Sequence, residues 1–147
     1  MKSLFNLFSI LLLSIIFFGC GSSKNMTVEK GAIAPDFPDF QGTLLIRKST
    51  LYNDNVINRK LDKNFKQYYG GSYVLIDYSD LKSAYNDIDK FRFVIGLELE
   101  ISGTSGMGRF KMFDRKTQRE YFTKWHDKYY FVIQHYAQAL GKYHNKK

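Results

Sequence analysis

The chain has 147 residues, of which 44% are hydrophobic and two are prolines, and its formal net charge is +8. This size and composition are typical of a single globular domain and exclude a disordered chain, a collagen and a disulfide scaffold. Because one cysteine cannot form an internal disulfide, it is either a packed thiol, a reactive group or a site of modification.

The first 19 residues have the pattern of a secretory signal. Lys2 supplies a positive charge, the run from Leu4 to Phe18 is mostly apolar, and the small residue Gly19 follows. A basic start, an apolar run of about 15 residues and a small residue at the cut are typical of a signal peptide. The run is shorter than the ~20 residues that cross a bilayer, so residues 1–19 are predicted to be removed.

Cys20 directly follows this run, in the sequence Phe17-Phe18-Gly19-Cys20. These residues resemble the lipobox of bacterial lipoproteins, in which a small residue precedes the cysteine. The resemblance implies that diacylglycerol is attached to the Cys20 sulfur, that the chain is cut before Cys20, and that the new N-terminus is acylated. Several acyl chains on one residue anchor a protein stably. We therefore expect an outer-membrane location facing the periplasm; an incidental cysteine after an uncleaved anchor is the alternative.

Residues 20–41 are predicted to be a lipid-anchored linker. They show no sustained helical or strand period, and both prolines lie between Ala34 and Phe40. Proline biases the chain toward extended geometry, so about 20 residues of stiff linker would reach roughly 65 Å. Phe37 and Phe40 either pack on the edge of the domain or belong to a docking peptide with a repeated Pro-Asp-Phe pattern.

The folded domain is predicted to span residues 42–147. A helix capped by Asn53 or Asp54 is expected because apolar residues recur at spacings of four, four and three before Gly70-Gly71. Its apolar stripe is Ile57, Leu61, Phe65 and Tyr68. Strands are expected at residues 42–47, 72–78 and 91–101, where the composition and the alternation fit.

Two hairpins follow the third of these strands. The first is expected to turn on residues 103–106 and the second on residues 114–117. A slip of one residue would set leucines against charged side chains, so the pattern indicates a register. The predicted apolar row is Leu99, Phe110 and Tyr121, each opposite the next. The predicted charged pairs are Glu98 with Lys111, Glu100 with Arg109, and Lys111 with Glu120. These five charged residues are expected to face solvent and to form a candidate partner face.

A last helix is predicted from about Lys124, because apolar residues recur there at helical spacing. Its stripe is Trp125, Tyr129, Val132, Ile133, Tyr136, Leu140 and Tyr143. The element order is thus β-α-β-β-β-β-α. This order predicts a two-layer α+β domain with a mainly antiparallel sheet, two helices on one face and charged residues on the other.

Three patterns were tested for catalytic or metal chemistry. Glu98 and Glu100 lie roughly 7 Å apart on one strand face, as paired glycosidase acids do, but each has a basic partner in the predicted register. The glycine-rich residues 103–108 lead into a strand and lack the ending of a phosphate loop. His126, His135 and His144 recur every nine residues, so on one helix the first and third would lie about 27 Å apart and share no metal ion. We expect no catalytic, cofactor or metal site, and a protein that is not an enzyme.

The remaining compositional features are the charge and the aromatic content. The basic residues are scattered and match no nucleic-acid motif, so no nucleic-acid partner is expected. Tyr68-Tyr69 and Tyr129-Tyr130 either form a stacking platform for a glycan or peptide, or belong to a core with a wet rim.

The strand Phe93-Val94-Ile95-Gly96 and the turn Asp114-Arg115-Lys116-Thr117 are similar to two families of envelope domains. These are the curli-secretion lipoproteins and the N-terminal domain of the Tol-system translocation protein, and the likeness spans about residues 42–122. It implies an α+β fold and a periplasmic setting, and it implies no active site. We expect an accessory, assembly or interaction module with an envelope protein partner; a glycan- or peptide-binding module is the alternative. The partner and the oligomeric state stay open.

Overall fold

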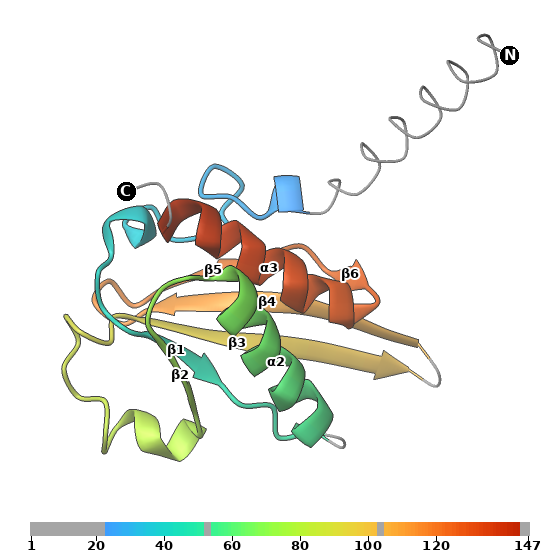
Figure 1. The fold of residues 1–147 in the computed structure, drawn as a ribbon, viewed down its shortest axis with the longest axis horizontal. Coiled ribbons are helices and arrows are strands. Elements are labelled where there is room, and N and C mark those ends of the chain that lie inside the picture. The colour runs from blue at the N-terminus through green and yellow to red at the C-terminus, as the bar shows by residue number, and fades with distance from the viewer. Residues whose placement is uncertain (1–22, 52–53, 103–104, 145–147) are drawn as a thin grey trace, which may run out of the picture.

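A computed structural model describes residues 23–51, 54–102 and 105–144 of the chain. Within these residues, two helices lie on one face of a mixed, mostly antiparallel sheet of six strands (Figure 1). The predicted α+β fold is therefore confirmed. The helices are α2 (Asp54–Tyr68) and α3 (Tyr129–His144), and short 3-10 turns are η1 (Ser23–Asn25), η2 (Phe37–Asp39) and η3 (Tyr78–Leu81). The strands are β1 (Leu44–Arg47), β2 (Tyr73–Ile76), β3 (Phe93–Ser102), β4 (Ser105–Asp114), β5 (Arg119–Phe122) and β6 (His126–Asp127).

The strand order is β2-β1-β3-β4-β5, and β6 pairs with β4. β1 is parallel to both β2 and β3, whereas the pairs formed by β4 are antiparallel. The β1–β2 pair is parallel because α2 carries the chain from the end of β1 back to the start of β2. The β1–β3 pair is parallel because residues 77–92, which include η3, carry the chain from the end of β2 back to the start of β3. In the part of the chain that is described, no helix has both the length and the hydropathy needed to span a bilayer.

α2 follows the predicted stripe closely. Ile57, Leu61 and Phe65 are fully buried, while Tyr68 is half-buried and the next residue, Tyr69, takes the core position instead. The helix ends at Tyr68, and Gly70 follows with a φ of 75°, the left-handed conformation common just after a helix end. α3 crosses α2 closely because Gly141 has no side chain: a Cβ there would lie 2.0 Å from the Tyr68 carbonyl oxygen.

α3 begins at Tyr129, so the predicted start at Lys124 is wrong. His126 and Asp127 instead pair with Gly108 and Met107 of β4, which satisfies backbone groups in a sheet ladder. Lys128 then adopts a φ of 59°, which separates this short strand from the helix. The stripe itself is confirmed within the helix: Val132, Ile133, Tyr136 and Leu140 are all buried.

Both hairpin registers differ from the prediction by two residues. Glu98 is opposite Arg109, Leu97 is opposite Phe110, and only residues 103–104 separate the paired ends of β3 and β4. In the second hairpin Phe113 is opposite Glu120, and the turn is formed by residues 115–118. Because side chains alternate with a period of two, a shift of two residues changes every partner but no face. The predicted direct pairs are therefore wrong, and the predicted division into an apolar and a charged face is right for these strands.

The residues from Met26 to Phe40 pack onto the domain, so the expectation of an extended linker is wrong for them. Their apolar side chains provide the reason: Met26, Ala32, Ile33, Ala34, Phe37 and Phe40 are all buried. The backbone is held as well, because the Tyr136 hydroxyl donates to the Ala32 carbonyl at 3.0 Å. The prediction that Phe37 and Phe40 pack on the domain is confirmed, and neither ring is free to act as a docking peptide.

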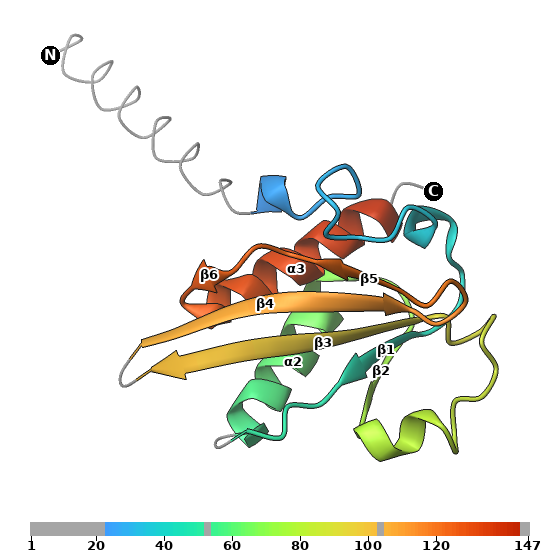
Figure 2. The ribbon, with the colours of Figure 1, turned by 180° about the vertical axis from the view of Figure 1, so that it is seen from behind.

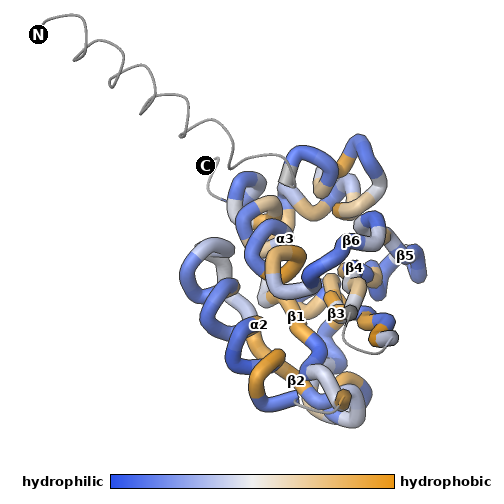
Figure 3. Tube along the Cα trace, turned by 90° about the vertical axis from the view of Figure 1, so that its right-hand side faces the viewer, coloured by the Kyte–Doolittle hydropathy of each residue, from blue (hydrophilic) through white to orange (hydrophobic). Residues whose placement is uncertain are grey.

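The main core lies between the helices and the sheet, where Figure 3 shows hydrophobic segments of both layers facing each other. At its centre Phe110 stacks on Tyr136 with ring centres 4.5 Å apart. A second, smaller cluster of Leu45, Ile76 and Val94 lies on the opposite face, below η3 and the loop that follows it. The face opposite the helices is thus covered at its β1–β2 side and uncovered along β3, β4 and β5 (Figure 2). We call this uncovered part the open face.

Candidate binding face

The open face carries the charged residues that the sequence predicted to face solvent. Arg109 Nε donates to Glu98 at 2.7 Å, and Lys111 Nζ lies 3.0 Å from Glu120 and 3.6 Å from Glu98. The row Glu98–Lys111–Glu120 therefore exists as diagonal contacts rather than as direct cross-strand pairs. The predicted pair of Glu100 with Arg109 is wrong, because Glu100 lies opposite Met107 and is exposed.

Arg109 is held between two aromatic rings. Its guanidinium carbon lies 4.6 Å from the ring centre of Phe122 and 4.6 Å from that of Trp125. Together with the ion pair to Glu98, these contacts fix the orientation of the guanidinium plane. The sequence assigned Trp125 to the stripe of the last helix; because α3 begins later, the ring packs beside Arg109 instead.

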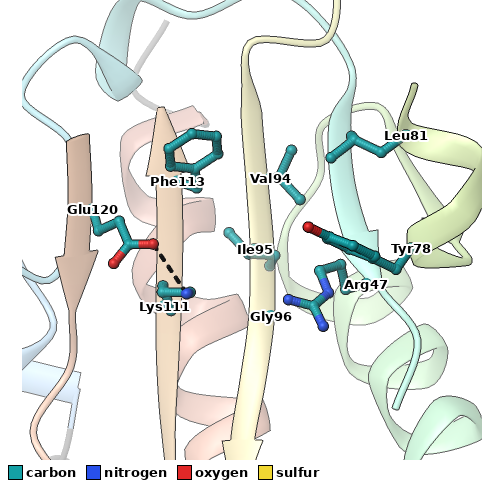
Figure 4. A pocket seen from close by; sticks show the side chains of 9 residues that line it. All are labelled: Arg47, Tyr78, Leu81, Val94, Ile95, Gly96, Lys111, Phe113 and Glu120. Carbon is teal, nitrogen blue, oxygen red and sulfur yellow. Dashed lines mark hydrogen bonds and ion pairs between the residues drawn. The ribbon is translucent and has the colours of Figure 1, made fainter. Parts of the chain in front are cut away.

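A pocket of about 210 Å³ adjoins this charged row (Figure 4). Its lining residues come from the four strands β1, β3, β4 and β5 and from η3: Arg47, Tyr78, Leu81, Val94, Ile95, Gly96, Lys111, Phe113 and Glu120. Gly96 leaves room in the middle, with Arg47 of β1 on one side and its cross-strand partner Lys111 on the other. A Cβ added at Gly96 would point at Arg47, whose Cδ atom would be 3.7 Å away.

Arg47 is the unusual residue of this pocket. Its guanidinium lies 4.7 Å over the Tyr78 ring, and its Nε is buried without a hydrogen-bond partner. Among the ion pairs of the described residues, none involves Arg47. A buried donor without an acceptor is costly, by about 1–3 kcal/mol, so the site favours an anionic oxygen supplied from outside. From the sequence, Arg47 is predicted only to end the first strand, because nothing in its local pattern signals the missing carboxylate.

The turn after β4 has a structural role. Asp114 is 1% exposed and accepts two hydrogen bonds from Arg92, at 2.9 and 2.7 Å, and one from the Thr117 hydroxyl at 2.8 Å. Burial alone would raise its pKa, but the bonds from Arg92, Thr117 and the Lys116 backbone N–H lower the pKa of Asp114 to about 2. Arg92 also binds Asp36 at 2.6 Å, which ties the N-terminal segment to the sheet.

The three histidines do not share one helix, so that part of the prediction is wrong. His126 lies in β6, whereas His135 and His144 lie in α3. Burial lowers the pKa of both His126 and His135, and the charge of His126 lowers the pKa of His135 further. Across residues 23–144, apart from the undescribed gaps, no three His, Cys, Asp or Glu side chains gather as metal ligands.

The tyrosine pairs have different environments. Tyr69 is fully buried and is not part of a surface platform. Tyr129 and Tyr130 have ring centres 4.0 Å apart, and Lys60 Nζ lies 3.4 Å from the Tyr130 ring centre. Tyr130 and Phe131 are 43% and 55% exposed, and Tyr129 and Tyr130 line a hollow of about 580 Å³ at the far end of the β3–β4 hairpin. An exposed aromatic surface therefore exists at the start of α3.

The comparisons with known proteins describe the fold only. The sequence matches no family model and no curated protein sequence. Among solved structures, the PelC dodecamer from Paraburkholderia phytofirmans is similar with a TM-score of 0.47 at 10% identity, over 69% of this chain and 87% of that chain. TolB from Acinetobacter baumannii is similar with a TM-score of 0.42 at 10% identity, over 69% of this chain and 27% of that chain. Likenesses of this size concern the arrangement of helices and strands and carry no argument about function.

Proposed function

We propose that this protein is a lipid-anchored, non-enzymatic envelope lipoprotein that binds an acidic group of a protein partner on its open face. The observation that carries the proposal is Arg47, a half-buried arginine at the wall of a pocket whose Nε is buried without a hydrogen-bond partner and which forms no ion pair among the described residues. The anchor is supported by the resemblance to a lipobox at Cys20, which lies outside the described residues. The distant likenesses to PelC and TolB are consistent with an envelope domain but add no argument for it.

The chemistry of the pocket favours a carboxylate. Arginine presents a planar fork of donors that matches a carboxylate in two parallel hydrogen bonds. Lys111 already contacts Glu98 and Glu120, so the unbalanced positive charge belongs to Arg47. Leu81, Val94 and Phe113 add an apolar wall. The partner therefore presents an acidic side chain or a C-terminal carboxylate next to an apolar residue.

The same contacts support a binding role rather than catalysis. Glu98 and Glu120 each accept a charge-assisted hydrogen bond from a basic neighbour, so their oxygens are already engaged in ion pairs. Such carboxylates suit electrostatic recognition more than proton transfer. Arg109, fixed between Phe122 and Trp125, supplies a second oriented cation beside the pocket.

The binding proposal is tested by crosslinking in cells followed by purification of the lipoprotein. Arg47→Gln removes the unpaired cation, and Gly96→Val fills the middle of the pocket, so both should reduce the crosslinked partner by about tenfold or more. Arg119→Gln is the matched control, because Arg119 is an exposed arginine of β5 outside the pocket. Undiminished crosslinking of both pocket variants would contradict the proposal, provided that their melting temperatures match that of the wild type.

The anchor is tested separately with Cys20→Ser. Without the thiol no lipid is attached, so the variant should accumulate as a larger, uncleaved precursor that takes up no radiolabelled fatty acid. Equal labelling of the wild type and the variant would show that Cys20 is not the lipidated residue.

A glycan- or peptide-binding module is the second candidate, favoured by the rings of Tyr129 and Tyr130, which line the hollow at the hairpin end, and by the exposed ring of Phe131 that follows them in the chain. Titration of envelope glycan fragments into the protein should then show saturable binding that Tyr130→Ala abolishes and Arg47→Gln leaves unchanged. The reverse pattern would favour the pocket on the open face.

A further inference from the structure

The folded domain begins only a few residues after Cys20 in the sequence, whereas a linker over residues 20–41 would have placed its start 22 residues later. η1 begins at Ser23, and Met26 is already fully buried. Ser23 comes three positions after Cys20 in the sequence, with two residues between them, and such a stretch spans at most about 11 Å even when it is fully extended. A lipid on Cys20 would therefore hold the domain at the membrane surface.

We infer that the surface around this entry point rests on anionic lipid headgroups; the inference depends on the proposed lipidation of Cys20. This surface, which we call the basal surface, consists of residues 24–31 and the last turn of α3. The two parts are neighbours because the Val28 N–H donates to the Tyr143 hydroxyl at 3.3 Å and η1 contacts α3. Figures 1 and 2 both show the N-terminal segment lying along α3, on the side of the molecule away from η3.

The basal surface is basic. Lys24, Lys30 and Lys142 are exposed, and Glu29 is the one acidic residue among residues 23–31 and 138–144. The sequence continues after His144 with Asn145-Lys146-Lys147, which adds two further basic residues next to this surface in the chain. Basic residues near a lipid anchor attract anionic headgroups, and the attraction falls off within a Debye length of about 8–10 Å. The short tether keeps the basal surface within about this distance.

The basal surface is also held rigidly against the sheet. A contact between the basal surface and the membrane would therefore fix the orientation of the whole domain. Ile33 is buried, the Phe122 N–H donates to the Gly31 carbonyl, and the Tyr136 hydroxyl donates to the Ala32 carbonyl. A membrane below the basal surface therefore leaves η3 and the β2 edge pointing away from it. The open face then stands beside the bilayer and is accessible to a partner.

The test uses the mature lipidated protein in nanodiscs that contain phosphatidylglycerol and a nickel-chelating lipid. Cys20 is the only cysteine of the chain, so once it is lipidated a new cysteine is the sole site for a nitroxide label. Lys142→Cys reports on the basal surface and Ala84→Cys, which is exposed in the loop after η3, reports on the far side. We expect relaxation of the label by headgroup nickel to be about threefold or more greater at position 142 than at position 84.

Two further arms test the role of charge. Nanodiscs in which phosphatidylcholine replaces phosphatidylglycerol at the same content of nickel-chelating lipid, or the double change Lys24→Gln/Lys30→Gln, should lower the relaxation at position 142 by about twofold. The matched control Lys63→Gln/Lys82→Gln removes the same charge from exposed positions outside the basal surface and should change nothing. Equal relaxation at positions 142 and 84 would overturn the inference. So would a difference that is the same in both lipids, because headgroup charge would then play no part.

Mass spectrometry of the labelled protein separates these outcomes from a failure of the anchor. A protein without lipid on Cys20 would contradict the proposed anchoring and this inference together. A lipidated protein with equal relaxation at both positions would contradict this inference alone.

Discussion

Two arginines beside the sheet show how differently the same side chain is used in this molecule. Arg92 binds two carboxylates, Asp114 and Asp36, at 2.7 and 2.6 Å. Arg47 lies against the Tyr78 ring, and among the described residues it has no carboxylate partner and its Nε has no acceptor. A satisfied buried ion pair holds a structure together, whereas an unsatisfied buried donor is ready to bind something else. The first region is therefore a structural joint and the second a candidate binding site.

The largest effect is expected at the structural joint. Asp114→Asn leaves Arg92 partly buried with only the exposed Asp36 as a charged partner, so the free energy of unfolding should fall by about 3 kcal/mol. Urea denaturation measures the loss. Lys116→Gln, which breaks the exposed contact with Asp89, is the control and should cost less than about 0.5 kcal/mol. Equal costs for both variants would show that burial of the Asp114 pair does not matter.

Acid should weaken the same joint. The pKa of Asp114 is lowered to about 2 in the folded state, while an unfolded aspartate titrates near 3.9. A carboxylate with a lowered folded pKa stabilises the fold above its unfolded pKa, and this contribution is lost as the pH falls through its folded pKa. About 2 kcal/mol of stability should therefore disappear between pH 4 and pH 2. Urea denaturation of the wild type and of Asp114→Asn across this range should converge at low pH; parallel curves would contradict the assignment.

Arg47 should behave in the opposite way to Arg92. Because its Nε has no acceptor, Arg47→Gln removes no ion pair and should change the free energy of unfolding by less than about 1 kcal/mol. The same change should strongly reduce partner binding. A loss of stability as large as that of Asp114→Asn would show that Arg47 is a structural residue, and the comparison would fail.

The smallest effect is expected on the charged row of the open face. Lys111→Gln breaks contacts of 3.0 and 3.6 Å to two glutamates that are partly exposed, so its cost should be about 0–1 kcal/mol. Thermal unfolding measures this cost. A cost of several kcal/mol would mean that the row is buried and that the open face is covered by something else.

The N-terminal segment shows where local patterns stop being informative. Ala34 to Phe40 contains both prolines and no period, which predicted an extended linker, yet Phe37 and Phe40 are buried. Whether an irregular segment packs depends on a complementary surface elsewhere in the chain. Here α3 and the sheet provide that surface, and they are encoded up to a hundred residues later. The same limit explains why Arg47 was not predicted as a site residue. The residues next to it in the sequence do not show whether a carboxylate will lie near its side chain in the fold.

The sequence by itself determined the α+β class, the apolar stripes of α2 and α3, and which side of β3 and β4 faces the core. Those properties follow from periods of 3.6 and 2, which are local and can be read from a few consecutive residues. Only the tertiary structure decided the hairpin registers, the start of α3 at Tyr129 and the packing of Met26 to Phe40. A shift of two residues preserves every face, so alternation cannot choose between such registers; the lengths of the turns and the pairing of β6 with β4 do. The tertiary structure alone also shows that Arg47 has no carboxylate partner among the described residues, because its neighbours in space come from distant parts of the chain.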